Sequence, residues 1–106
     1  MTCEDFLAKL YATIKDRKNA DPGTSYVASL FAKGRSKIAQ KVGEEATETV
    51  IAASGGKPQE VVRESADLLF HLMVLWADCG IAPEDVLGEL KRREGMSGLE
   101  EKMSRQ

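Results

Sequence analysis

The sequence has few of the features that build sheets, membrane spans or cysteine-ligated metal sites. Aromatic residues make up 6% of its 106 residues, and β-branched residues never alternate with polar ones over the length of a strand. No apolar run is long enough to span a membrane, and no basic-then-apolar signal opens the chain. Cys3 and Cys79 lack metal-ligand spacing and are expected to stay reduced. We therefore expect a soluble, cytoplasmic, all-α protein.

Charge and length narrow the choice of binding partners and of domain organisation. Charged residues make up 30% of the chain, but the net charge of −2 gives no general polyanion-binding signal, so we expect neither nucleic acid nor membrane as a partner. The length suits one domain with a modest core. We predict a single α-helical domain over residues 1–95 and a polar C-terminal tail over 96–106 that is partly helical or frayed.

Start and stop signals predict five helices. Thr2 forms a capping box for the first helix, Ser25 caps a short helix over 26–33, and Ser36 caps a third that runs to about residue 53. Pro58 opens the fourth helix, which ends at Cys79-Gly80, and Pro83 opens a fifth that Gly95 ends.

The large apolar residues of the short helix are expected to be core contacts rather than a ligand platform, because such side chains are mostly buried. They are Tyr26, Val27, Leu30 and Phe31.

The third and fourth helices carry carboxylates on faces that should point inward. Glu45 falls within the apolar arc of the third helix, with Glu48 as its neighbour one turn on. The fourth helix is apolar over most of its circumference, so its acidic stripe should be partly buried. That stripe is roughly 80° wide at 100° per residue and contains Glu60, Glu64, Asp67, His71 and Asp78. Close carboxylates do not all stay ionised without a cation, and an oxygen-only cluster suits Mg²⁺, with Mn²⁺ as a possible substitute.

A solvated helix face is the competing interpretation of the acids. Glu44 and Glu48 could pair with Lys41 and Lys37 at i,i+3 or i,i+4 spacing, which leaves the role of Glu44 open. For Glu45 we favour a functional role, because an unpaired buried carboxylate is costly.

A di-iron bundle is the competing metal site, and it needs Glu-x-x-His motifs. Three positions before the only histidine, His71, the sequence has Leu68 and not Glu, so the motif is absent. His71 could support a metal ligand, contact the substrate or be a satisfied core histidine.

Basic residues precede the carboxylates. Lys37 and Lys41 share a helical stripe with Glu44 and Glu48, next to the proposed metal. Mg²⁺ is typically held by a few carboxylates and by substrate phosphates, so neighbouring lysines would take the remaining phosphate charge. We predict Lys33, Lys37 and especially Lys41 as substrate contacts, with helix solubility as the alternative.

The apolar circumference of the fourth helix also predicts assembly. Four or five helices can hardly cover every side of one member, so a second chain should bury the remainder. A homodimer with twofold symmetry is the simplest expectation.

Several segments together resemble the phosphoribosyl-ATP pyrophosphohydrolase family of MazG-like all-α nucleoside triphosphate pyrophosphatases. They are Ser25-Tyr26, Lys33-Gly34, residues 37–48 with their Glu-Glu-x-x-Glu motif, and residues 64–71 with their Glu-x-x-Asp motif. The resemblance runs from Phe6 to about Gly95. It implies a four- to five-helix bundle completed by dimerisation. It also implies Mg²⁺-dependent hydrolysis of a small nucleotide, phosphoribosyl-ATP, to phosphoribosyl-AMP and pyrophosphate, the second step of histidine biosynthesis.

Carried over by position, the resemblance makes Glu45, Glu48, Glu64 and Asp67 the metal ligands and Glu44 a ligand or base. The metal would activate water and phosphate, and Lys41 would stabilise the leaving group. Two alternatives stay open, namely a house-cleaning pyrophosphatase of the same fold and a non-catalytic helical dimer with a merely solvated acidic face.

Overall fold

The computed structural model describes residues 1–105, which form six α-helices and no strand, so the all-α prediction is confirmed. The helices are α1 (Cys3–Asp16), α2 (Tyr26–Lys33), α3 (Arg35–Gly55), α4 (Pro58–Cys79), α5 (Pro83–Arg92) and α6 (Gly98–Ser104). The helix α6 lies in the predicted tail, which is therefore partly helical, and α5 ends at Arg92, before the expected Gly95.

Local signals set most of the helix ends. Thr2 and Asp5 form the predicted capping box of α1. The Ser25 hydroxyl accepts a hydrogen bond of 3.2 Å from the Ala28 amide, as expected of a residue that caps α2. The predicted cap at Ser36 is wrong, because Gly34 ends α2 and also precedes α3 directly. Gly34 has a φ of 95°, a backbone conformation that glycine adopts without strain. The chain therefore turns at Gly34, and no capping residue separates the two helices.

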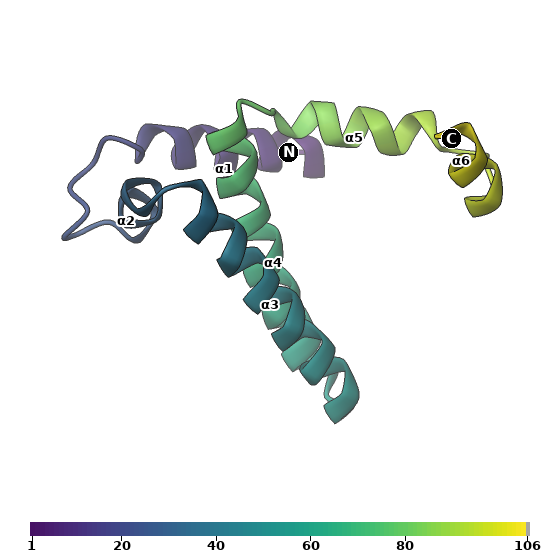
Figure 1. The fold of residues 1–106 in the computed structure, drawn as a ribbon, viewed down its shortest axis with the longest axis horizontal. Helices are drawn as coiled ribbons and strands as arrows, with labels where there is room; N and C mark the ends of the chain where they lie inside the picture. The colour runs from purple at the N-terminus through teal and green to yellow at the C-terminus, as the bar shows by residue number, and fades with distance from the viewer. Residues whose placement is uncertain (106) are drawn as a thin grey trace.

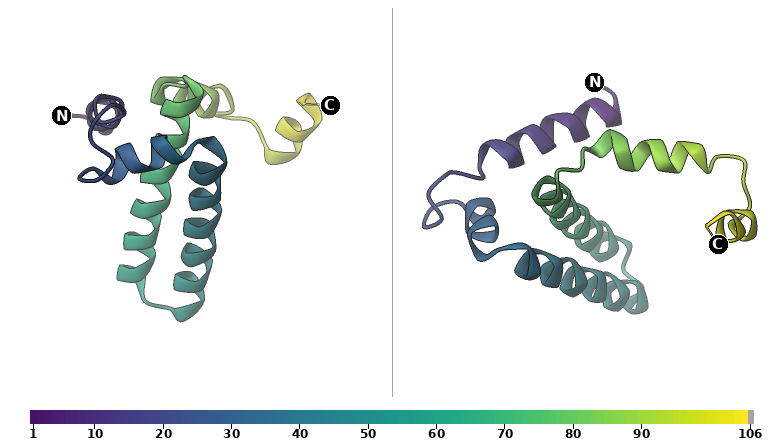
Figure 2. Two further views of the ribbon diagram at one scale, coloured as in Figure 1. Left: turned by 60° about the vertical axis from the view of Figure 1, so that its left-hand side comes forward. Right: turned by 45° about the horizontal axis from the view of Figure 1, so that its top comes forward.

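The helices α3 and α4 form a long antiparallel hairpin, which turns at Gly56-Lys57 (Figure 1; Figure 2, left). The helices α1, α2 and α5 gather at the opposite end: α2 packs on α3, and α1 packs on α4 and α5. The helix α6 lies beyond α5, away from the hairpin (Figure 1). One half of the hairpin is therefore enclosed by other helices, and the half near the turn projects outward.

The core lies where the first four helices meet. Its fully buried side chains are Ile14, Leu30, Ile38, Met73 and Val74. From the short helix, Val27 and Phe31 pack partly buried against this core, as predicted. Tyr26 does not, and that expectation is wrong. Tyr26 opens α2 at the rim of the core, and its hydroxyl makes a hydrogen bond to His71.

The fourth helix is buried only in part. Met73 and Val74, near its C-terminal end, are fully buried, whereas Val62 near the hairpin turn is 70% exposed. On α3, Val50 and Ile51 near the same turn are also exposed. The reason is that α1 and α2 reach only the opposite end of the hairpin.

No single helix within residues 1–105 is both long enough and apolar enough to cross a membrane. The helices α4 and α5 meet that criterion only when taken together, and they are bent by 107° at the break between them.

The two serines provide a test of the helix caps. Ser25→Ala should lower the free energy of unfolding by about 1 kcal/mol, because the Ala28 amide loses its acceptor. Ser36→Ala is the matched control and should change it little, since α3 has no side-chain cap. Urea titration followed by circular dichroism measures both. Equal losses would contradict the cap assignment.

Candidate metal and catalytic site

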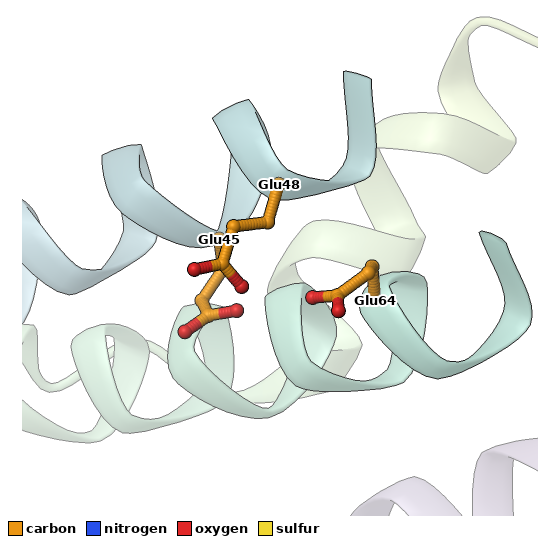
Figure 3. A group of neighbouring side chains, drawn as sticks. All are labelled: Glu45, Glu48 and Glu64. Atoms are coloured by element: carbon orange, nitrogen blue, oxygen red, sulfur yellow. The ribbon is translucent and has the colours of Figure 1, made fainter. Parts of the chain in front are cut away.

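Three carboxylates converge in the gap between α3 and α4. Glu45 and Glu48 lie one turn apart on α3, so both project from the same side of that helix. Glu64 projects toward them from α4 (Figure 3). One oxygen from each of the three lies within 4.8 Å of the others. The structure thus brings together three of the four predicted metal ligands.

Burial makes this group unfavourable without a cation. Glu45 is only 7% exposed, and its Oε2 and that of Glu64 are buried without a hydrogen-bond partner among the described residues. Burial, and then the charge of Glu48, raises the pKa of Glu45. Burial, and then contact with the Glu48 carboxyl, raises the pKa of Glu64. Three converging carboxylates, two of which have a buried oxygen without a partner, fit a hard divalent cation.

Asp67, the fourth predicted ligand, lies next to this group but not in it. Its carboxylate is exposed and is not among the three oxygens that lie within 4.8 Å of one another. Its charge nevertheless contributes to the raised pKa values of Glu45 and Glu64, so it is close to both. Its role as a ligand stays a prediction.

Among the predicted phosphate contacts, Lys41 lies closest to the carboxylates. Its Nζ is 3.2 Å from Oε2 of Glu44 and 3.8 Å from Oε1 of Glu45. The hydrogen bond to Glu44 raises the pKa of Lys41, so it stays charged. Lys37 is half-buried and near enough to Glu44 to lower its pKa, whereas Lys33 is exposed at the end of α2.

Glu44 and Glu45 are neighbours in sequence but have opposite environments. Glu44 is exposed and accepts a hydrogen bond of 2.8 Å from Gln40. That bond, and then the one from Lys41, lowers the pKa of Glu44, whereas burial raises that of Glu45. Carboxyl groups with pKa values moved apart in this way can take different acid–base roles.

His71 is 6% exposed, and both of its ring nitrogens have partners. Nδ1 is 2.7 Å from the backbone carbonyl oxygen of Asp67, and Nε2 is 2.8 Å from the Tyr26 hydroxyl. This geometry favours a supporting role, although its predicted substrate contact remains untested.

An open pocket of about 300 Å³ adjoins the carboxylates, and its lining includes Glu48, Glu64 and Arg63. The sequence reasoning did not single out Arg63. Its signal was the spacing from Glu60, three positions earlier, which places Arg63 beside the acidic stripe of α4. Arg63 adds a positive charge to the lining of this pocket.

The fold and the site define an all-helical protein with a carboxylate cluster between two antiparallel helices. A model of the phosphoribosyl-ATP pyrophosphohydrolase family matches residues 7–94. Relatives named phosphoribosyl-ATP pyrophosphatase include one from Rhizorhabdus wittichii, 64% identical over 93% of this chain and 93% of its own length. Another, from Paramagnetospirillum magneticum, is 60% identical over 93% of this chain and 91% of its own. A third, from Geobacter sulfurreducens, is 58% identical over 96% of this chain and 94% of its own. The chain belongs to the phosphoribosyl-ATP pyrophosphohydrolase family, as its sequence motifs indicated.

The burial of Glu45 gives a pH-dependent stability prediction. Because folding raises its pKa, ionisation of Glu45 destabilises the native protein as the pH rises from the unfolded-state value of about 4.3 through the folded-state pKa. With EDTA at pH 8, Glu45→Gln should therefore have a higher Tm than the wild type. The difference should vanish below about pH 4, where the carboxyl is protonated in both states.

Thermal melts followed by circular dichroism at several pH values measure this difference. Glu94→Gln, at an exposed acid of the same type, is the control and should leave Tm unchanged at every pH. A lower Tm for Glu45→Gln at pH 8 would show that the ionised carboxylate stabilises the fold.

Proposed function

We propose that this chain hydrolyses phosphoribosyl-ATP to phosphoribosyl-AMP and pyrophosphate, the second step of histidine biosynthesis. The observation that carries the proposal is the convergence of Glu48 and Glu64 on the buried Glu45, with Lys41 beside Glu45. The family membership supports the choice of substrate, because relatives of nearly the same length are named for that substrate.

We propose Mg²⁺ as the metal, with Mn²⁺ as a substitute. Glu45, Glu48 and Glu64 would hold it, and Asp67 is the candidate for a further ligand. The fit rests on the two buried carboxylate oxygens that lack a partner. When bound, the ion would neutralise phosphate charge and polarise the anhydride bond.

The remaining charged residues have roles that follow from their positions. Lys41 would exchange its contacts with Glu44 and Glu45 for a phosphate oxygen and so stabilise charge on the leaving pyrophosphate. Lys37 and Lys33 would extend the positive charge along the triphosphate. Glu44 is the best-placed general base, because its lowered pKa keeps it ionised and able to accept a proton from water.

Pyrophosphate release tests this proposal directly. The wild type should release pyrophosphate rapidly from phosphoribosyl-ATP with Mg²⁺, and little with EDTA or from ATP and dUTP. Glu48→Gln should lower kcat by about 100-fold or more, because a charged group at the reacting phosphates is lost. A coupled pyrophosphate assay measures both.

Glu94→Gln is the control and should keep wild-type activity, since this exposed acid lies on the segment after α5. Faster release from ATP or dUTP would instead favour a house-cleaning pyrophosphatase. No release from any substrate would favour a structural role for the acids.

We also propose that the chain acts as a homodimer. Val50, Ile51 and Val62 form an exposed apolar surface on the projecting half of the hairpin, with no other helix of residues 1–105 packed over it. A second copy placed there would bury it with twofold symmetry. We propose a cytoplasmic location as well. Cys3 and Cys79 are free thiols, which reducing compartments favour.

Light scattering tests the dimer. The wild type should have twice the 11.6 kDa mass of the chain, and Val62→Lys should shift it toward the monomer by placing a charge in an apolar interface. Leu90→Lys, at a 57% exposed position on α5, is the control and should stay dimeric. A monomeric wild type would contradict the proposal.

A further inference from the structure

Tyr26 is an exposed aromatic residue whose ring is held firmly in place. It is the first residue of α2, and its side chain is 51% exposed. Its hydroxyl is 2.8 Å from Nε2 of His71, a buried residue of α4. The two rings meet edge to face, with centroids 5.8 Å apart. One end of the Tyr26 ring is therefore anchored, while much of its surface remains open.

The direction of the anchoring bond follows from the other side of the imidazole. Nδ1 of His71 is 2.7 Å from the backbone carbonyl oxygen of Asp67, which can only accept a hydrogen bond. Nδ1 therefore donates, and in the tautomer that carries a proton on Nδ1 alone, Nε2 accepts from the Tyr26 hydroxyl. Phe70 packs edge to face on the same imidazole and steadies it. The hydroxyl is thus engaged by the imidazole, and the exposed aromatic surface is the larger contact that Tyr26 offers to a ligand.

The anchor ties this surface to the helix that carries Glu64 and Asp67. The Tyr26 hydroxyl is near enough to Lys41 to contribute to the raised pKa of that lysine. His71, which anchors Tyr26, also contacts the backbone carbonyl of Asp67, the candidate for a further ligand. One hydrogen-bonded chain therefore links the ring to the acidic stripe of α4.

We propose that the exposed ring of Tyr26 is the subsite for the purine base of the substrate, which stacks on it while the phosphates lie at Lys41 and the carboxylates. The inference rests on the proposed function, since it names where a nucleotide would place its base. Aromatic rings bind bases through their faces, and a ring held by a neighbouring group loses little conformational freedom on binding. The predicted site residues are all charged or imidazole groups, so the ring provides the missing apolar contact.

Two separate probes distinguish a base contact from a general structural role. AMP carries the purine, and pyrophosphate carries phosphates alone. Isothermal titration calorimetry with Mg²⁺ should show that Tyr26→Leu weakens AMP binding by about tenfold or more and leaves pyrophosphate binding unchanged. Tyr26→Phe keeps the ring and should retain most of the AMP affinity. Phe6→Leu makes a comparable change at a 53% exposed aromatic on α1 and should affect neither probe.

A measurement on the unaltered protein keeps the test independent of how the variants fold. The chain has two tyrosines, Tyr11 and Tyr26, and the Tyr26→Phe spectrum identifies which proton resonances belong to Tyr26. AMP should shift the Tyr26 ring resonances through the ring current of the purine, whereas pyrophosphate should not. The resonances of Tyr11, on α1, are the internal control and should stay in place.

Several results would overturn the subsite. They are an absence of AMP binding to the wild type, equal losses of AMP and pyrophosphate binding in Tyr26→Leu, or unchanged AMP binding in that variant. Unshifted Tyr26 resonances at saturating AMP would also overturn it. Failure of the wild type to hydrolyse phosphoribosyl-ATP is a distinct result, because it rejects the proposed function while the AMP titration still decides the role of Tyr26.

Discussion

The mutual repulsion of Glu45, Glu48 and Glu64 in a partly dry gap is the constraint on which the rest of the structure depends. Carboxylates this close separate unless their backbones are held. The enclosed end of the hairpin supplies that hold through Ile38 on α3, which is fully buried in the same core as Met73 and Val74 on α4. An ion pair from Arg35 to Asp78, 2.8 Å long, joins the same ends of the two helices. Arg35 is largely exposed, so this pair adds little stability, and apolar packing holds the carboxylates together. The repulsion between the carboxylates is thus opposed by the packing of the neighbouring core.

The Glu-Glu-x-x-Glu pattern separates its acids by helix geometry. Successive residues differ by about 100° around a helix, so Glu44 and Glu45 cannot point the same way. Glu45 and Glu48 face the gap, whereas Glu44 faces solvent, Gln40 and Lys41. The inward acids have environments that call for a cation, and the outward one is kept ionised by hydrogen bonds. One turn of helix therefore supplies both metal-ligand candidates and a base candidate, without a second loop or domain.

The sequence predicted what depends on one helix and missed what depends on several. Periodicity placed Glu45 inward and capping signals placed the start of α2, because both are decided within a few residues. The position of Asp67 relative to the cluster depends on how α3 and α4 cross, which periodicity does not encode. The Tyr26 hydroxyl makes a hydrogen bond to His71, 45 positions away, and periodicity within one helix does not encode such a contact. Ser36 was misjudged because capping preference does not reveal that Gly34 has a positive φ.

The exposed apolar surface and the acidic site share a border, which links assembly to binding. Ile51 lines the same pocket as Glu48 and Glu64. A second chain that covers Ile51 would therefore also remove water from around the carboxylates. Their repulsion would then be less screened, so the dimer would need a cation more than the monomer does. By linkage, a cation that binds the dimer more tightly also strengthens the dimer. In this arrangement, the exposed Ile51 needs a covering chain and the unpartnered oxygen of Glu64 needs a cation, and the two needs meet at one pocket.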